Sequence, residues 1–350
     1  MTTAPLALAC PLPLTGTDRV LMGHGAGGRL FGELFDTLLG PLTGAGPVAE
    51  DAAVVPVDGP DGVRVVVSTD SFVVTPRDFP GGDIGSLAVH GTVNDVAMRG
   101  ARPIAITLAY IIEEGFPVDE LARVTASAAA AAAEAGVPIV TGDTKVVERG
   151  GADGIYVNTT GIGVLLPDAA VTAAGAVPGD AVLLSGPVGR HGAAVLAARE
   201  GFDFDEPSDS CALGRMVEDM VGAGGAGVHV LRDATRGGLA AVLNELAAAS
   251  GVGIEIDEAA AATTDQVAAL CDVLGLDPFH LACEGTLVAI CAPEAAADVL
   301  AAMRARPEGK GARRIGAVTA AAEPRVLART PLGTARVVDP PLGEQLPRIC

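Results

Sequence analysis

The sequence contains no tryptophan, and aromatic residues make up only 3% of its 350 positions. Small aliphatic side chains must therefore fill any hydrophobic core. The chain is too long for one ordinary core, because most domains hold about 100 to 150 residues. We therefore expect two domains, each large enough to fold around its own core.

Positive charge is also scarce. Lys and Arg together number 23 against 43 Asp and Glu, which gives a formal net charge of -20. Nucleic-acid backbones require a basic face, so we expect no nucleic-acid partner. We expect no membrane span either, because no uncharged apolar run reaches about 18 residues. The apolar segment 5–14 is interrupted by three prolines and lacks a basic region before it, so it does not read as a signal peptide.

The cysteines show neither a CxxC pair nor a zinc-like spacing; they stand at positions 10, 211, 271, 283, 291 and 350. Reduced thiols in the cytoplasm are the simplest explanation. Cys350 is different, because a thiol at a mobile chain end can be loaded with a group and carried between sites. A frayed end is the alternative. Prolines at 340, 341 and 347 disfavour helix, so we expect an extended tail from about residue 330 that enters no sheet.

Hydrophobic periodicity divides the chain into a disordered leader (1–18), a first domain (19–167), a second domain (168–330) and a flexible tail (331–350). In the first domain we predict strands at 52–57, 63–68, 103–112, 137–141 and 154–166, with helices at 29–39, 83–98 and 118–135. In the second we predict strands at 181–185, 228–232, 286–291 and 314–318, with helices at 193–200, 212–221, 239–249, 265–274 and 294–304. The fold class is therefore α/β or α+β.

A glycine-rich loop at residues 23–29 formally contains the GxGxxG pattern of dinucleotide-binding proteins. That fingerprint requires a buried strand before the glycines, and residues 17–22 are too polar to supply one. The loop precedes a predicted helix, however, and backbone N–H groups there can hold a phosphate. Gly25, Gly27 and Gly28 are the candidate contacts.

Several acidic residues stand beside Val-rich runs, namely Asp51, Asp70, Asp143 and Asp233, and Asn94-Asp95 lies on the predicted helix 83–98. Acids at strand ends meet where a cleft opens in α/β folds, and their oxygens suit Mg²⁺ held against phosphate. A single Asp after a strand is more often a turn or capping residue.

Only two of the 23 basic residues are lysines, Lys145 and Lys310. Lys145 belongs to Gly142-Asp143-Thr144-Lys145, directly after a predicted strand. A lysine can lose its proton or hold a phosphate as a point charge, whereas arginine stays protonated. A surface lysine without a role is the alternative.

Two further segments are candidates. Residues 232–238 form a strand-to-helix turn in which Arg236 and Gly237 suit a phosphate. Glu284 lies between an apolar segment and a predicted strand, where burial would raise its pKa toward that of a general base. An exposed strand position is the alternative for Glu284.

These segments together resemble the HypE family, the carbamoyl dehydratases of nickel–iron hydrogenase maturation, within the superfamily of aminoimidazole ribonucleotide synthetase and selenophosphate synthetase. The matching stretches are residues 24–28, 68–74, 79–85, 91–98, 142–147, 233–238 and 347–350. They extend over nearly the whole chain, and the terminal Pro-Arg-Ile-Cys separates this family from its relatives. Ala26 and Cys283 depart from the Ser and Asn of the family pattern.

The resemblance implies a two-domain fold like that of aminoimidazole ribonucleotide synthetase, with N-terminal strands that form a barrel across a homodimer. It implies that a HypF-like partner carbamoylates Cys350 and that the tail inserts beside Mg-ATP. Dehydration to a thiocyanate would then supply cyanide to iron on a HypC–HypD-like complex. Cys350, Glu284 and Lys145 would be catalytic.

The remaining residues would bind ATP or Mg²⁺. The ATP set is Gly25, Gly27, Gly28, Asn94, Gly142, Asp143, Thr144, Arg236 and Gly237, and the metal set is Asp51, Asp70, Asp95 and Asp233. Two other functions remain open. A phosphotransferase of the same superfamily, of thiamine-monophosphate or selenophosphate type, would not use a terminal cysteine, and a nicotinamide oxidoreductase would use residues 23–28.

Overall fold

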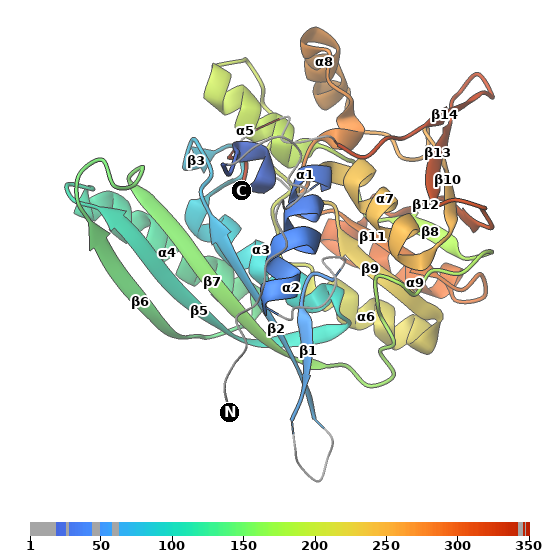
Figure 1. The fold of residues 1–350 in the computed structure, drawn as a ribbon, viewed down its shortest axis with the longest axis horizontal. Coiled ribbons are helices and arrows are strands. Elements are labelled where there is room, and N and C mark those ends of the chain that lie inside the picture. The colour runs from blue at the N-terminus through green and yellow to red at the C-terminus, as the bar shows by residue number, and fades with distance from the viewer. Residues whose placement is uncertain (1–18, 26–27, 44–49, 58–62, 342–345, 347) are drawn as a thin grey trace, which may run out of the picture.

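The structure is a computed structural model that describes residues 19–25, 28–43, 50–57, 63–341, 346 and 348–350. The predicted leader 1–18 therefore lies outside the described residues, as does Gly27. In the described part of the chain, two large β-sheets have helices packed around them, and a third sheet has only two short strands (Figure 1). The architecture is thus mixed α/β, as the sequence predicts.

The first sheet has the strand order β1-β2-β7-β5-β6 and is open. Its strands are β1 (Ala53–Pro56), β2 (Arg64–Phe72), β5 (Ala101–Glu113), β6 (Ile139–Val147) and β7 (Ile155–Leu165). The predicted strands 52–57 and 63–68 correspond to β1 and β2, which pair antiparallel. Strand β6 pairs parallel with β5 after the crossover helix α4 (Val118–Ala135).

One face of this sheet is covered by α3 (Ile84–Met98), which packs against β2, β5, β7 and α4. Asp83 caps this helix by accepting from the N–H groups of Gly85 and Ser86, and the Ser86 hydroxyl lies 3.0 Å from the backbone N of Asp83. This capping box fixes where α3 begins. A short ribbon of β3 (Asp78–Phe79) and β4 (Gly82–Asp83) precedes it.

The second sheet is mixed, with the order β14-β13-β10-β12-β8-β11-β9. Its strands are β8 (Ala181–Leu184), β9 (Val228–Asp233), β10 (Gly253–Asp257), β11 (Leu287–Cys291), β12 (Arg313–Thr319), β13 (Arg325–Arg329) and β14 (Ala335–Val337). The helices around it are α5 (Arg190–Glu200), α6 (Gly214–Gly224), α7 (Gly238–Ser250), α8 (Asp265–Leu274) and α9 (Ala296–Arg304). The central strands β8 and β11 are buried along their whole length.

The prediction that residues beyond 330 enter no sheet is wrong for Ala335–Val337. These residues form β14 and pair antiparallel with β13. A turn through Thr330 and Gly333, where Gly333 has φ +81°, reverses the chain before the prolines at 340 and 341 begin. Pro331 favours this turn, because its fixed φ suits the second turn position. The sequence reading also missed β10 and β13.

The N-terminal helical segment extends further than predicted. Helix α1 (Gly28–Leu34) continues through a π-helical turn, Phe35–Leu39, into α2 (Gly40–Thr43). The prediction that the helix ends at residue 39 is therefore wrong. The Gly40 N–H bonds the Phe35 carbonyl, which leaves Pro41 at the start of α2, where a missing N–H costs least. No helix among the described residues is long and apolar enough to cross a membrane.

Candidate active site

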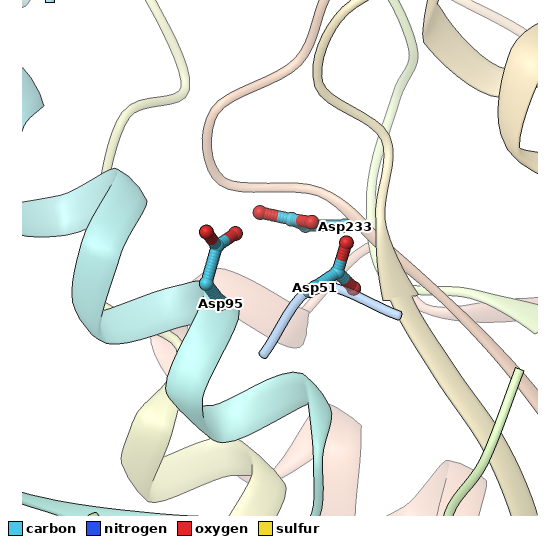
Figure 2. Close-up of side chains that lie close together, drawn as sticks. All are labelled: Asp51, Asp95 and Asp233. Atoms are coloured by element: carbon cyan, nitrogen blue, oxygen red, sulfur yellow. The ribbon is translucent and has the colours of Figure 1, made fainter. Parts of the chain in front are cut away.

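Three carboxylates from separate elements converge on one point. Asp51 lies two residues before the start of β1, Asp95 lies on α3 and Asp233 ends β9, and one oxygen atom of each lies within 4.8 Å of the others. Figure 2 shows the three side chains facing a common space. Asp70, on β2, lies close to this cluster, since its charge contributes to the raised pKa of Asp95 and Asp233, and it lines a cavity together with Asp51 and Asp95. The structure therefore brings together all four residues that the sequence offered as metal ligands.

The electrostatics of this carboxylate cluster favour a cation. Burial raises the pKa of Asp51 and Asp95 well above the usual range, and it raises the pKa of Asp233 to about 6. Neither carboxylate oxygen of Asp233 has a hydrogen-bond partner among the described residues. Arg232 pairs with Asp51 at 2.7 Å and offsets part of the charge. Buried carboxylates without partners are costly, so the oxygen-rich cluster fits a hard divalent cation such as Mg²⁺.

The cluster opens into a cavity of about 650 Å³ that Glu284 and Cys350 also line. Glu284 is only 2% exposed, and its Oε1 has no hydrogen-bond partner within the described part of the chain. Burial raises the pKa of Glu284 well above its usual value, with Asp233 as the next cause. The exposed-strand alternative for Glu284 is therefore wrong, because the residue lies in a buried loop before β11.

Asp209 fixes the loop that carries Glu284. Its carboxylate accepts from the N–H groups of Glu284 and Gly285, both at 3.1 Å, and from the Thr286 hydroxyl at 2.9 Å. The sequence reading missed Asp209, because it lies in an irregular loop that no periodic pattern marks.

Asn94 also helps to hold the loop that carries Glu284, and it does not line the cavity. Its Nδ2 donates to the carbonyls of Cys211 at 2.9 Å and Glu284 at 3.4 Å, and its Oδ1 accepts from the Leu213 N–H at 2.8 Å. The side chain is fully buried, and its donors and acceptor are occupied. The structure thus gives Asn94 a positioning contact to Glu284 where the sequence suggested an ATP contact.

A second cavity, of about 470 Å³, adjoins the glycine-rich loop and is lined by Gly25, Arg236, Gly237 and Cys350. The Arg236 guanidinium donates to the Gly25 carbonyl at 3.1 Å. Gly237 has φ +75° and precedes α7, so the turn presents the first N–H groups of that helix. Three of the predicted phosphate contacts therefore meet here, and Gly28 begins the neighbouring helix α1.

Residues 142–145 lie elsewhere. The prediction that they follow a strand is wrong, because β6 runs on to Val147 and contains them. Asp143 and Lys145 are both exposed and form an ion pair with each other. Gly142 is required for pairing, since a Cβ there would meet the Leu108 carbonyl oxygen at 1.9 Å. Within one chain, neither Lys145 nor Thr144 lines the two cavities described above.

The C-terminal residues lie against the body of the protein. Backbone N–H groups of Val73 and Thr75 donate to the carbonyls of Cys350 and Arg348, at 3.1 and 3.0 Å. Ile349 is 8% exposed and joins the hydrophobic core that contains Phe72 and Val74. Cys350 thus reaches both cavities. The described cysteines, at 211, 271, 283, 291 and 350, form no disulfide.

Comparison with known proteins places these features in a family. Two family models match the chain, described as AIR synthase related protein, N-terminal domain, over residues 49–165 and C-terminal domain over residues 177–329. The carbamoyl dehydratase HypE of Cupriavidus necator is 51% identical over 350 residues, with 99% of each chain covered. The chain belongs to the HypE family.

Solved HypE structures agree in fold. A HypE–HypF complex matches with a TM-score of 0.82 and 46% identity, covering 88% of this chain and 99% of that one. HypE in complex with ATP matches with a TM-score of 0.79 and 46% identity, covering 95% and 100%. Family membership makes this chain a hydrogenase maturation factor of the carbamoyl dehydratase type. The phosphotransferase and oxidoreductase alternatives are correspondingly disfavoured.

Proposed function

We propose that this protein dehydrates a carbamoyl group carried on the Cys350 thiol to a thiocyanate, with ATP as the co-substrate. The product would supply cyanide for the iron of nickel–iron hydrogenase. One observation carries the proposal: in a member of the HypE family, Cys350 lines the same cavity as Asp51, Asp70, Asp95 and buried Glu284. The reactive tail and the binding groups therefore meet in one place.

Asp51, Asp95 and Asp233 are the residues that would hold Mg²⁺, with Asp70 at the edge of the cluster. The glycine-rich loop with Gly25, Gly27 and Gly28 and the turn with Arg236 and Gly237 would hold the phosphates of ATP. When bound, Mg²⁺ and ATP provide the charge neutralisation and the phosphoryl group that turn the carbamoyl oxygen into a leaving group. The contribution of the protein is to align Cys350 with these groups and to exclude bulk water.

Glu284 would take one of the two protons that the carbamoyl nitrogen loses when the carbamoyl group becomes a thiocyanate. Its pKa is raised by burial, so its ionised form is a stronger base than an exposed glutamate. Oε1 has no partner among the described residues, and the loop is held by Asp209 and Asn94. A positioned carboxylate with an open acceptor is what proton transfer requires.

We infer that the protein acts as a homodimer in which Lys145, with Gly142, Asp143 and Thr144, contributes to the site of the partner. Strand β6 is the open edge of the first sheet, and its exposed apolar side chains include Val140 at 56% and Val146 at 67%. Edge strands of this kind favour pairing with another sheet. A barrel shared between two protomers would cover this edge and would give Lys145 a role that it lacks within one chain.

The tail would meet other proteins in turn. A HypF-like carbamoyltransferase would load Cys350, and a HypC–HypD-like complex would accept the cyanide at its iron. The solved HypE–HypF complex supports the first partnership. Thiols that must stay reduced fit the cytoplasm.

The test is the intact mass of the protein after carbamoylation by a HypF-type enzyme, measured before and after addition of Mg-ATP. We expect the mass to rise by one carbamoyl group and then to fall by one water. The Cys350→Ser variant is the control and should show neither change. Retention of the carbamoyl mass after ATP, with ATP bound, would exclude dehydration and would favour the phosphotransferase alternative.

A further inference from the structure

Helix α5 contacts the last residues of the chain through two polar side chains on one face. His191 and Arg199 are eight residues apart, close to two helical turns, so both project toward the tail. Arg199 donates to the Arg348 carbonyl at 2.9 Å and to the Thr75 carbonyl at 2.6 Å. His191 lies 2.6 Å from the Ile349 carbonyl through its Nε2. The tail is therefore held between α5 and residues 73–75.

The surroundings of His191 determine its tautomer. A carbonyl oxygen only accepts, so Nε2 must carry the proton that bonds Ile349. Burial lowers the pKa of His191, which keeps the ring neutral, so Nδ1 is an acceptor. Nδ1 lies 2.8 Å from the Ser208 hydroxyl, which donates to it and in turn accepts from the Ser210 N–H at 3.1 Å. The Ile349 carbonyl thus sets the tautomer, and the Ser208 hydroxyl stabilises it and fixes the orientation of the ring.

The ring is also fixed by packing. His191 is fully buried, and Phe79 packs edge-on against it with ring centroids 5.2 Å apart. Arg348, one residue before Ile349, adopts φ +58°, which is unfavourable for a side chain with a Cβ. A tail that was simply frayed would leave this conformation, so the contacts around it must hold it there.

We propose that His191, oriented by Ser208, is a positioning residue that holds the tail through its hydrogen bond to the Ile349 carbonyl, a contact called the clasp below. This contact positions the Cys350 thiol in the cavity that Glu284 also lines. The inference rests on the proposed function and adds to it the residues that decide how long the tail stays inserted. Loading by a HypF-type enzyme needs the tail outside, whereas dehydration needs it inside. Weakening the clasp should therefore spare the first step and slow the second.

The test compares His191→Phe, His191→Gln and Ser208→Ala in the full-length protein. Phe keeps the ring shape and removes the donor, whereas the amide of Gln can still donate to the Ile349 carbonyl. Iodoacetamide labelling followed by mass spectrometry gives the rate at Cys350, with fully buried Cys291 as the internal measure of unfolding. His229→Phe is the matched control, because its ring pairs with Asp180 and not with the tail.

We expect His191→Phe to raise the labelling rate of Cys350 about tenfold, in line with loss of a buried hydrogen bond, while Cys291 stays protected. Ser208→Ala should give a smaller increase, and His191→Gln should restore most of the protection. Single-turnover dehydration should slow by a similar factor in His191→Phe with carbamoylation unchanged. Unaltered labelling of Cys350 in folded His191→Phe and Ser208→Ala would overturn the proposal. Labelling needs no ATP, so it tests the clasp even if the unmodified protein fails to dehydrate its tail.

Discussion

Glu284 and Asp233 are both almost fully buried, and each has a carboxylate oxygen without a partner in the described part of the chain. Their chemistry should nevertheless differ. Asp233 faces two other carboxylates, which favours a shared cation. Glu284 is held through its backbone by the side chains of Asp209 and Asn94, which leaves its carboxylate available as a proton acceptor for the tail.

Glu284→Gln keeps the shape of the side chain and removes its basicity. We expect normal carbamoylation and ATP binding, with dehydration slowed by at least about 100-fold, the usual range for loss of a general base. Single-turnover mass spectrometry of the Cys350 peptide gives this rate. Asp272→Asn, a change on helix α8, is a control that should leave the rate unaltered. A Gln variant with the rate of the unmodified protein would remove Glu284 from the mechanism.

Mg²⁺ binding should weaken as the pH falls through about 6, because burial raises the pKa of Asp233 to about 6 and protons then compete for its oxygens. Between about pH 4 and 6 the metal-free folded state retains a proton that the unfolded chain has released, so its stability falls as pH rises. The gain in Tm from Mg²⁺ should therefore be large at pH 7.5 and small at pH 5. Asp233→Asn should abolish the gain at both values. A gain in Tm that is independent of pH would contradict the assignment of Asp233.

At the scale of elements, apolar periodicity predicts the position of most strands and helices. The reason is that the buried face of each element produces a regular pattern of apolar residues along the sequence. Helices α4 and α8 begin and end where the sequence predicts. The extent of β6 was not predictable in this way. Its residues 140–146 are exposed, and Gly142 suggests a strand end, whereas pairing with β5 carries the strand through. Long-range pairing of this kind overrides local preference.

Gly142→Ala tests that pairing directly. A methyl group at this position would meet the Leu108 carbonyl oxygen, so β6 must separate locally from β5. We expect a loss of stability of about 1 to 3 kcal/mol, measured by urea unfolding, because overpacking of this size is costly. Gly150→Ala is not a clean control because of its positive φ, but Gly222→Ala on α6 meets no atom within 4 Å and should be neutral or stabilising. Equal stability of Gly142→Ala and the unmodified protein would mean that the β5–β6 register is wrong.

At the scale of the whole molecule, the site is built from both halves of the chain. Asp51, Asp70 and Asp95 belong to the first half and Asp233 and Glu284 to the second. The sequence predicted all five as site residues from their positions beside apolar runs and from the family resemblance. It did not reveal Asp209, His191 or Arg199, because their roles depend on contacts between loops and helices that are distant in sequence.

The proposed dimer makes a prediction about mixtures. If Lys145 acts on the site of the partner, Asp233→Asn and Lys145→Ala chains should each be inactive alone and should complement each other when coexpressed. A random mixture contains half heterodimers, each with one intact site, so about a quarter of the sites should be active. Native mass spectrometry gives the fraction of heterodimer. Absence of dehydration in a sample that contains heterodimers would place Lys145 in its own subunit or outside the reaction.

The three clustered carboxylates come from different halves of the chain, which affects how rigidly the two halves are joined. Asp51 and Asp95 belong to the first half and Asp233 to the second, so one cation bound among them would add a cross-link to the packing, the hydrogen bonds and the Arg232–Asp51 ion pair that already join the two halves. Binding of the cation would then also make the contact between α3 and β9 more rigid. Removal of the cation by a chelator would first increase the rate of amide hydrogen exchange at this contact.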